Sequence, residues 1–141
     1  MSFDIYAFTH GDPCGTDEFE QAEKSLGHML PPELVRIYKL ANGFRGPTNA
    51  AFLYPLQEGQ SFNQETAVGL TRFFRQDPGH SELWKRAVAF GDFGIGATWG
   101  INIDTNQVFE WWPDDGEQII ELGTSIFDVW GKKKEWYDKV V

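Results

Sequence analysis

The sequence has a single cysteine, Cys14, among its 141 residues, and this excludes a disulfide within the chain. It also has no apolar run close to the roughly eighteen residues that a membrane span needs, because glycine or charged residues interrupt every run. The first residues, MSFD, contain neither a basic region nor an apolar stretch. We therefore expect no secretory signal and a cytoplasmic protein that does not enter a membrane.

Basic residues are scarce. The sequence has 12 Lys and Arg against 21 Asp and Glu, which gives a formal net charge of -9. Nucleic-acid phosphates would repel such a surface, so we expect no direct contact with nucleic acid. A basic protein partner is compatible with this charge, although many acidic proteins are charged only for solubility.

Aromatic residues, in contrast, are abundant. They make up 16% of the chain, with 6 Trp and 12 Phe. Large aromatic side chains favour strands, so this share predicts a sheet packed against helices rather than a helical bundle. The length suits one domain over residues 1–141. We expect an α+β fold in which a mainly antiparallel, twisted sheet is flanked by N-terminal and C-terminal helices.

The stretch FGDFGIGATWGINIDTNQVFEWW, residues 90–112, is the centre of the predicted sheet. Apolar and polar residues alternate from residue 97 onward, which predicts a half-buried strand. A three-residue loop with Asn106 in the left-handed conformation would place Ile101 opposite Phe109 in a hairpin. One buried face would then hold Trp99, Ile101, Ile103, Phe109 and Trp111, and the other face Asn102, Asp104, Glu110 and a partly exposed Trp112. Four nearby glycines, at positions 91, 94, 96 and 100, indicate positive φ angles or close backbone approaches.

The remaining elements follow from end signals and periodicity. We expect a helix from residue 16 to a stop at Gly27, and a second helix opened by Pro31-Pro32 and closed by Asn42-Gly43. Further elements are a strand over 51–56 beside the hairpin, a helix over 63–75, strands over 87–90 and 118–122, and a closing helix after Ser125. That last helix should bury Trp130 and Trp136.

No motif in the sequence specifies catalysis, a metal or a cofactor. Gly94 and Gly96 resemble part of a dinucleotide-binding loop, but Trp99 stands where the third glycine belongs and a strand follows instead of a helix. His10, Asp12 and Cys14 have the right chemistry for zinc but not the spacing, so a surface turn is the better interpretation. We therefore expect no bound metal and no cofactor.

The order of several short motifs resembles a known family. These are LG at 26–27, LPPEL at 30–34, ANG at 41–43, AVAFGDFGIG at 87–96, ID at 103–104, Val108, and LGTSIF at 122–127. As a set, over about residues 16–138, they are similar to the SUKH superfamily, the homology domain of fungal cell-wall-synthesis regulators and of many small bacterial proteins. The resemblance implies an α+β fold and a binding role, and the compact, acidic chain looks more like the bacterial toxin-immunity type.

We therefore hypothesise a non-catalytic, intracellular protein-binding domain that neutralises a basic toxin domain, such as a nuclease, by occlusion. Two alternatives stay open: a small-ligand binder or enzyme with a pocket at the glycine loop and Trp99, and a regulatory scaffold. The predicted partner-binding surface is an acidic, aromatic rim around the hairpin. It consists of Asp92, Asp104, Glu110, Trp112, Asp114, Asp115 and Glu117.

Overall fold

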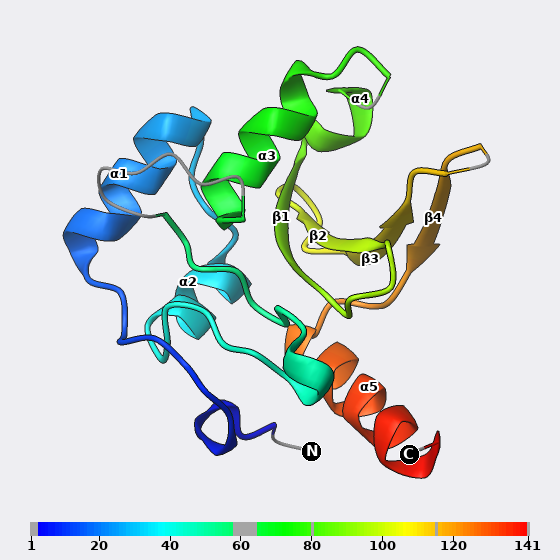
Figure 1. The fold of residues 1–141 in the computed structure, drawn as a ribbon. Coiled ribbons are helices and arrows are strands. Elements are labelled where there is room, and N and C mark those ends of the chain that lie inside the picture. Colours follow the sequence, from blue (N-terminus) through cyan, green and yellow to red (C-terminus); the bar gives the residue numbers. More distant parts are fainter. Residues whose placement is uncertain (1–2, 58–64, 80, 115, 141) are drawn as a thin grey trace.

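The computed structural model describes residues 3–57, 65–79, 81–114 and 116–140. The helical elements are η1 (Ile5–Ala7), α1 (Thr16–Leu26), α2 (Pro32–Tyr38), η2 (Pro47–Asn49), α3 (Ala67–Gln76), α4 (Ser81–Trp84) and α5 (Ile126–Val140). The strands are β1 (Ala87–Asp92), β2 (Thr98–Asn102), β3 (Val108–Trp112) and β4 (Gln118–Glu121). They form one antiparallel sheet in the order β1-β2-β3-β4, with helices on both sides (Figure 1). The predicted α+β class is confirmed.

The helix ends follow the chemistry of their terminal residues. The Glu18 carboxylate accepts a hydrogen bond from the Gly15 N–H at 3.2 Å at the start of α1, and Gly27 ends this helix at φ 84°. α2 begins at Pro32, and the Ser125 hydroxyl accepts the Asp128 N–H at the start of α5. α3 begins at Ala67, four residues later than its predicted cap, Asn63, which lies outside the described residues.

The β2–β3 hairpin differs from the predicted pairing by one residue. Gly100 pairs with Phe109 and Ile101 with Val108, because the loop holds four residues instead of three. The Asn102 N–H donates to the Gln107 carbonyl at 2.9 Å, and Asn106 takes the left-handed conformation at φ 61°. The prediction that Ile101 and Phe109 share one buried face is therefore wrong, and their side chains lie on opposite faces of the sheet.

Both faces of this sheet are buried, which explains the error. On one face, the ring of Trp99 packs against Phe52 and Phe90. On the other face, Phe109 and Trp111 pack against Trp84 of α4, and Trp111 also contacts Phe74 of α3. When both faces are covered, the alternation of apolar and polar residues no longer fixes the register.

Gly100 has a packing role in the observed register. A Cβ added there would lie 2.5 Å from Cζ of Phe109 and 2.9 Å from the ring of Trp84, so only glycine leaves room for both rings. At Gly91 an added Cβ would lie 2.0 Å from the carbonyl oxygen of Phe52, whereas Gly94 and Gly96 have φ angles of 81° and 94°. The predicted close approaches and positive φ angles are thus both present.

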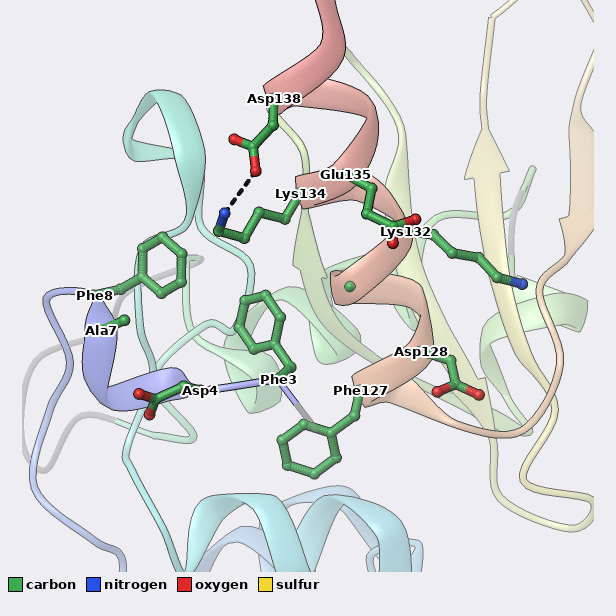
Figure 2. Close-up of a pocket in the computed structure, with 11 residues that line it drawn as sticks. Phe3, Asp4, Ala7, Phe8, Phe127, Asp128, Lys132, Lys134, Glu135 and Asp138 are labelled. Carbon is green, nitrogen blue, oxygen red and sulfur yellow. Dashed lines mark hydrogen bonds and ion pairs between the residues drawn. The ribbon is translucent and has the colours of Figure 1, made fainter. Parts of the chain in front are cut away.

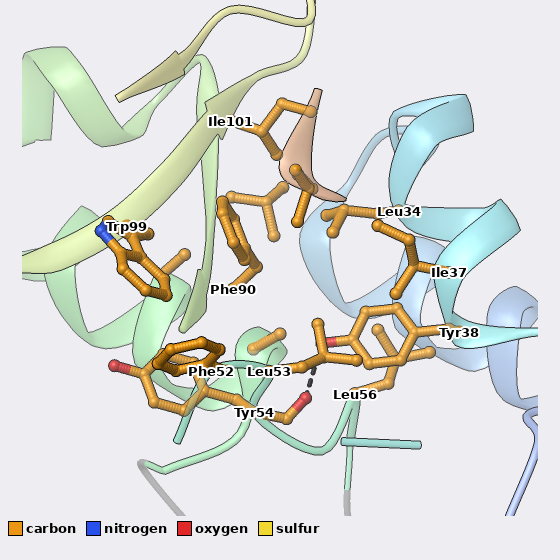
Figure 3. Packing of buried hydrophobic residues seen from close by; sticks show 14 of the residues in the cluster. Leu34, Ile37, Tyr38, Phe52, Leu53, Tyr54, Leu56, Phe90, Trp99 and Ile101 are labelled. Carbon is orange, nitrogen blue, oxygen red and sulfur yellow. Dashed lines mark hydrogen bonds between the residues drawn. The ribbon is translucent and has the colours of Figure 1, made fainter. Parts of the chain in front are cut away.

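The Trp99 face of the sheet carries the main core, which Figure 3 shows from close by. Leu34 and Ile37 of α2 point toward Phe90 and Ile101, and all four side chains are fully buried. The Tyr38 hydroxyl donates a 2.6 Å hydrogen bond to the Tyr54 carbonyl, which ties α2 to the segment 51–56. Trp130 of α5 closes the same core against Phe44 and Phe90.

The segment 51–56 is not the regular strand that its composition predicts, and it lies beside β1 rather than beside the hairpin. The Tyr54 N–H donates to the Phe90 carbonyl, and the Asp92 N–H donates to the Ala51 carbonyl. A further bridge joins Leu53 to Phe44. Its hydrogen bonds are shared between two neighbours and Pro55 has no N–H, so no continuous ladder forms. The segment nevertheless covers the outer edge of β1.

Candidate functional site

Glu110 of β3 is a carboxylate buried at the centre of a polar cluster. It is 6% exposed and accepts hydrogen bonds from the indole N–H groups of Trp99, at 3.1 Å, and Trp112, at 3.0 Å. The ammonium of Lys133 on α5 lies 3.4 Å from the same carboxylate. The observed hairpin register causes this arrangement, because it places Glu110 on the face that carries Trp99. The prediction that Glu110 is an exposed rim residue is therefore wrong.

We call Trp99, Glu110, Trp112 and Lys133 the Glu110 cluster. Trp112 is half-buried, as predicted, and its indole is held in place by Glu110. The Lys133 ammonium also lies 5.7 Å from the centre of the Phe93 ring. The Phe93 ring packs edge-to-face against Trp136, with 5.7 Å between the two ring centres. Trp136 is 54% exposed, so the prediction that it is buried is wrong. It lies seven residues after the buried Val129, on the same side of α5, which is why its spacing suggested burial.

Asp92 and Asp104, two further residues of the predicted partner-binding rim, lie in different parts of the sheet. Asp92 ends β1, where it accepts the Tyr54 hydroxyl at 2.7 Å and the Gly94 N–H at 2.8 Å. Asp104 lies in the hairpin loop, at the opposite end of β3 from Trp112, and is bound by the Arg86 guanidinium, which lowers the pKa of the Asp104 carboxyl. The structure thus separates Asp104 from the rest of the predicted rim.

The loop between β3 and β4 carries the remaining acidic residues. Asp114 is exposed, and Asp115 lies outside the described residues. Glu117 is also exposed and accepts the indole N–H of Trp111 at 2.9 Å. Asp114 and Glu117 therefore remain exposed acidic residues in the loop that follows Trp112, but Glu117 lies on the Trp111 face of the sheet, opposite the Glu110 cluster. The aromatic part of the surface around the Glu110 cluster includes Trp136, which the sequence did not single out for this surface.

The chain matches the model of the SMI1 / KNR4 family (SUKH-1) over residues 13–132. It belongs to this family. The match includes the whole sheet and the first half of α5, and so contains Trp99, Glu110 and Trp112. No curated protein matches the sequence.

Trp99, which the small-ligand and enzyme alternative placed in a pocket at the glycine loop, is a core residue of this SUKH-1 domain. The Trp99 side chain is 1% exposed, and the rings of Phe52, Phe90 and Phe93 pack around it. The Trp99 indole is therefore surrounded by aromatic side chains of the core.

A groove of about 550 Å³ lies instead between the N-terminal segment and α5 (Figure 2). Its apolar side chains include Phe3, Phe8 and Phe127, and Lys134 pairs with Asp138 above them at 2.7 Å. The charged groups along the groove are carboxylates and ammonium groups, with no histidine or cysteine among the lining residues. The groove therefore presents an apolar floor flanked by charged side chains of both signs.

Cys14 is buried, and its thiol has low reactivity. Burial and the neighbouring Glu18 carboxylate raise the pKa of its thiol to about 12, so the reactive thiolate is scarce at neutral pH. Across the described ranges of the chain, no group of three or more His, Cys, Asp and Glu residues could hold a metal ion. Nor does this part of the chain contain a helix with the length and apolar character of a membrane span.

Proposed function

We propose that this SUKH-1 domain is a non-catalytic protein-binding domain that neutralises a basic toxin domain, such as a nuclease, by covering its active groove. The observation that carries the proposal is a pair of indoles held by one network at the surface. Trp112 is fixed by the buried Glu110, and Trp136, 54% exposed, is joined to the same network through Phe93 and Lys133. Exposed tryptophans that are already ordered are typical anchors of protein interfaces.

Charge supports the choice of partner. The chain carries a net charge of -9, and the exposed carboxylates of Asp114 and Glu117 lie next to the strand that ends in Trp112. Such carboxylates can occupy a basic groove that otherwise binds phosphates, through charge-assisted hydrogen bonds. The family resemblance agrees with this proposal, because bacterial members are regarded as immunity proteins.

Genomic context provides the first test. We expect the reading frame to lie directly downstream of a gene for a large secreted toxin. The toxin domain encoded by that gene, produced with and without this chain, then gives a neutralisation assay. A position inside a metabolic operon would instead favour the small-ligand alternative, and binding without neutralisation would favour a regulatory scaffold.

Binding kinetics with the same toxin domain test the site. Trp112→Ala and Trp136→Ala should each increase the dissociation rate, at a cost on the order of 2 kcal/mol for a desolvated anchor. Phe73→Ala is the matched control, because Phe73 is a 45% exposed aromatic on α3, on the other side of the sheet. Equal dissociation rates for all three variants and the wild type would place the interface elsewhere on the domain.

A further inference from the structure

The two edges of the sheet differ in whether another segment covers them. The outer edge of β1 is covered by the segment 51–54, through hydrogen bonds of 2.7 and 2.8 Å. β4 forms the other edge, and all four of its residues are exposed. In Figure 1, β4 lies at the rim of the molecule, and no described element runs along its outer side. One edge of the sheet is therefore open.

The hydrogen-bond pattern shows which backbone groups this open edge presents. The Leu122 N–H donates to the Val108 carbonyl at 2.8 Å, so Val108 is a hydrogen-bonded position of the β3–β4 ladder. Bonded and non-bonded positions alternate along an antiparallel pair. Because Glu110 pairs with Ile120 and Trp111 with Ile119, the N–H and C=O of Ile120 point toward β3. Those of Ile119 and Glu121 point outward.

One face of the β4 region carries an acidic, an apolar and an acidic side chain in turn, namely Glu117, Ile119 and Glu121. Ile119 is 46% exposed on the face that carries Trp111, and Ile120 is 42% exposed on the opposite face. Glu117 and Glu121 lie on either side of Ile119, on the same face of the strand. Open edges of natural sheets are commonly protected by shortness, charge, proline or a bulge. β4 is four residues long and its only charged residue is Glu121, so its protection is acidic and acts against acidic strands more than against basic ones.

We infer that the outer edge of β4 binds an extended segment of a partner protein, which adds a fifth strand to the sheet through the backbone groups of Ile119 and Glu121. The segment would carry basic side chains opposite Glu117 and Glu121 and an apolar side chain opposite Ile119. This inference rests on the proposed function to the extent that the partner is the same basic toxin domain. It adds how that partner is held.

A second copy of the chain fits this edge less well. Antiparallel pairing of two β4 strands around Ile119 would set Glu117 of one copy opposite Glu121 of the other, and like charges directly opposite each other are destabilising. Each copy would also carry a net charge of -9. Charge complementarity therefore favours a basic partner strand over self-association.

Proline substitution separates backbone pairing from side-chain contact. Ile119→Pro removes only an outward N–H, at an edge position where proline is tolerated, and so should leave the β3–β4 ladder intact. Ile119→Thr is the matched control, because it keeps the N–H and the β-branched shape. The probe is a synthetic peptide of alternating lysine and valine, and an otherwise identical peptide with glutamate in place of lysine is the charge control.

We expect Ile119→Pro to bind the lysine–valine peptide roughly tenfold more weakly than Ile119→Thr, because one outward hydrogen bond and the extended pairing around it are lost. In the wild-type chain, the peptide should slow amide hydrogen exchange at Ile119 and Glu121, and the glutamate peptide should not. Equal binding by the two variants, or unchanged exchange at saturating peptide, would overturn the inference. If Ile119→Pro does not fold, the exchange measurement on the wild type decides.

The same exchange and binding measurements with the toxin domain distinguish this inference from the proposed function. Neutralisation without protection of the Ile119 and Glu121 amides would overturn this inference and leave the proposed function standing. Binding of the peptide without any binding of the toxin domain would support strand addition at β4 and contradict the proposed function. Protection that rises with protein concentration in the absence of peptide would show a second copy at the edge and overturn the assignment to a basic partner.

Discussion

At the scale of single residues, Glu110 has the most constrained surroundings in the Glu110 cluster. Its carboxylate accepts two indole N–H groups and lies 3.4 Å from the Lys133 ammonium. Glu110→Gln keeps the shape but gives the side chain one oxygen and one NH₂ group, so one indole would face a donor. We expect the free energy of unfolding to fall by about 1–3 kcal/mol in urea titrations, the cost of a buried donor that loses its acceptor.

Lys133→Met is the matched control for Glu110→Gln. It removes the ammonium but leaves both indole hydrogen bonds in place, and the methionine stem can still cover the Phe93 ring. The loss of stability should therefore be smaller than for Glu110→Gln. If Glu110→Gln is as stable as the wild type, the two indole contacts do not contribute to the fold as described.

Cys14 gives a prediction about alkaline stability. Its thiol pKa rises from 9.0 to about 12 on folding, so the unfolded chain loses this proton first as pH increases. The raised pKa therefore contributes fully to the free energy of unfolding below pH 9.0. This contribution is lost between pH 9.0 and about 12, at no more than roughly 1.4 kcal/mol per pH unit. Unfolding titrations from pH 8 to 11 should thus show a steeper loss for the wild type than for Cys14→Ala. Parallel curves would contradict the raised pKa.

At the scale of elements, the hairpin register depends on Gly100. Gly100→Ala would place a methyl group 2.5 Å from Phe109 and 2.9 Å from Trp84, both well packed, so the rings or the strands must shift. We expect a loss of about 1–3 kcal/mol in thermal or urea unfolding, as for other overpacked cores. Gly79→Ala is the control, because its Cβ would meet only an Asp77 carboxylate oxygen at 3.4 Å. A wild-type stability for Gly100→Ala would contradict the register.

These elements also show what the sequence can predict in this protein. The ends of α1, α2 and α5 follow from local signals, Gly27, Pro32 and Ser125, whose effect does not depend on the rest of the fold. The register of the hairpin and the burial of Glu110 depend on side chains far away in the sequence, such as Trp84 and Lys133. No local pattern contains that information, and the candidate site was therefore only partly predictable.

At the scale of the whole molecule, the net charge of -9 has a kinetic consequence for a basic partner. Exposed charges at the rim of an interface mainly accelerate association, and salt screens their attraction at separations beyond about 8 Å at physiological ionic strength. A double variant, Asp114→Asn with Glu117→Gln, should therefore associate several-fold more slowly with the toxin domain at low salt, and with a weaker salt dependence. The dissociation rate should change little.

The control must have the same net charge. Asp17→Asn with Glu20→Gln removes the same two charges from α1, where both residues are exposed and which lies across the molecule from β4 in Figure 1. If the local field of the β3–β4 loop steers the partner, only the Asp114 and Glu117 variant slows association strongly. Equal slowing by both variants would show that total charge alone acts, and salt-independent association would remove electrostatic steering from the mechanism even if neutralisation is retained.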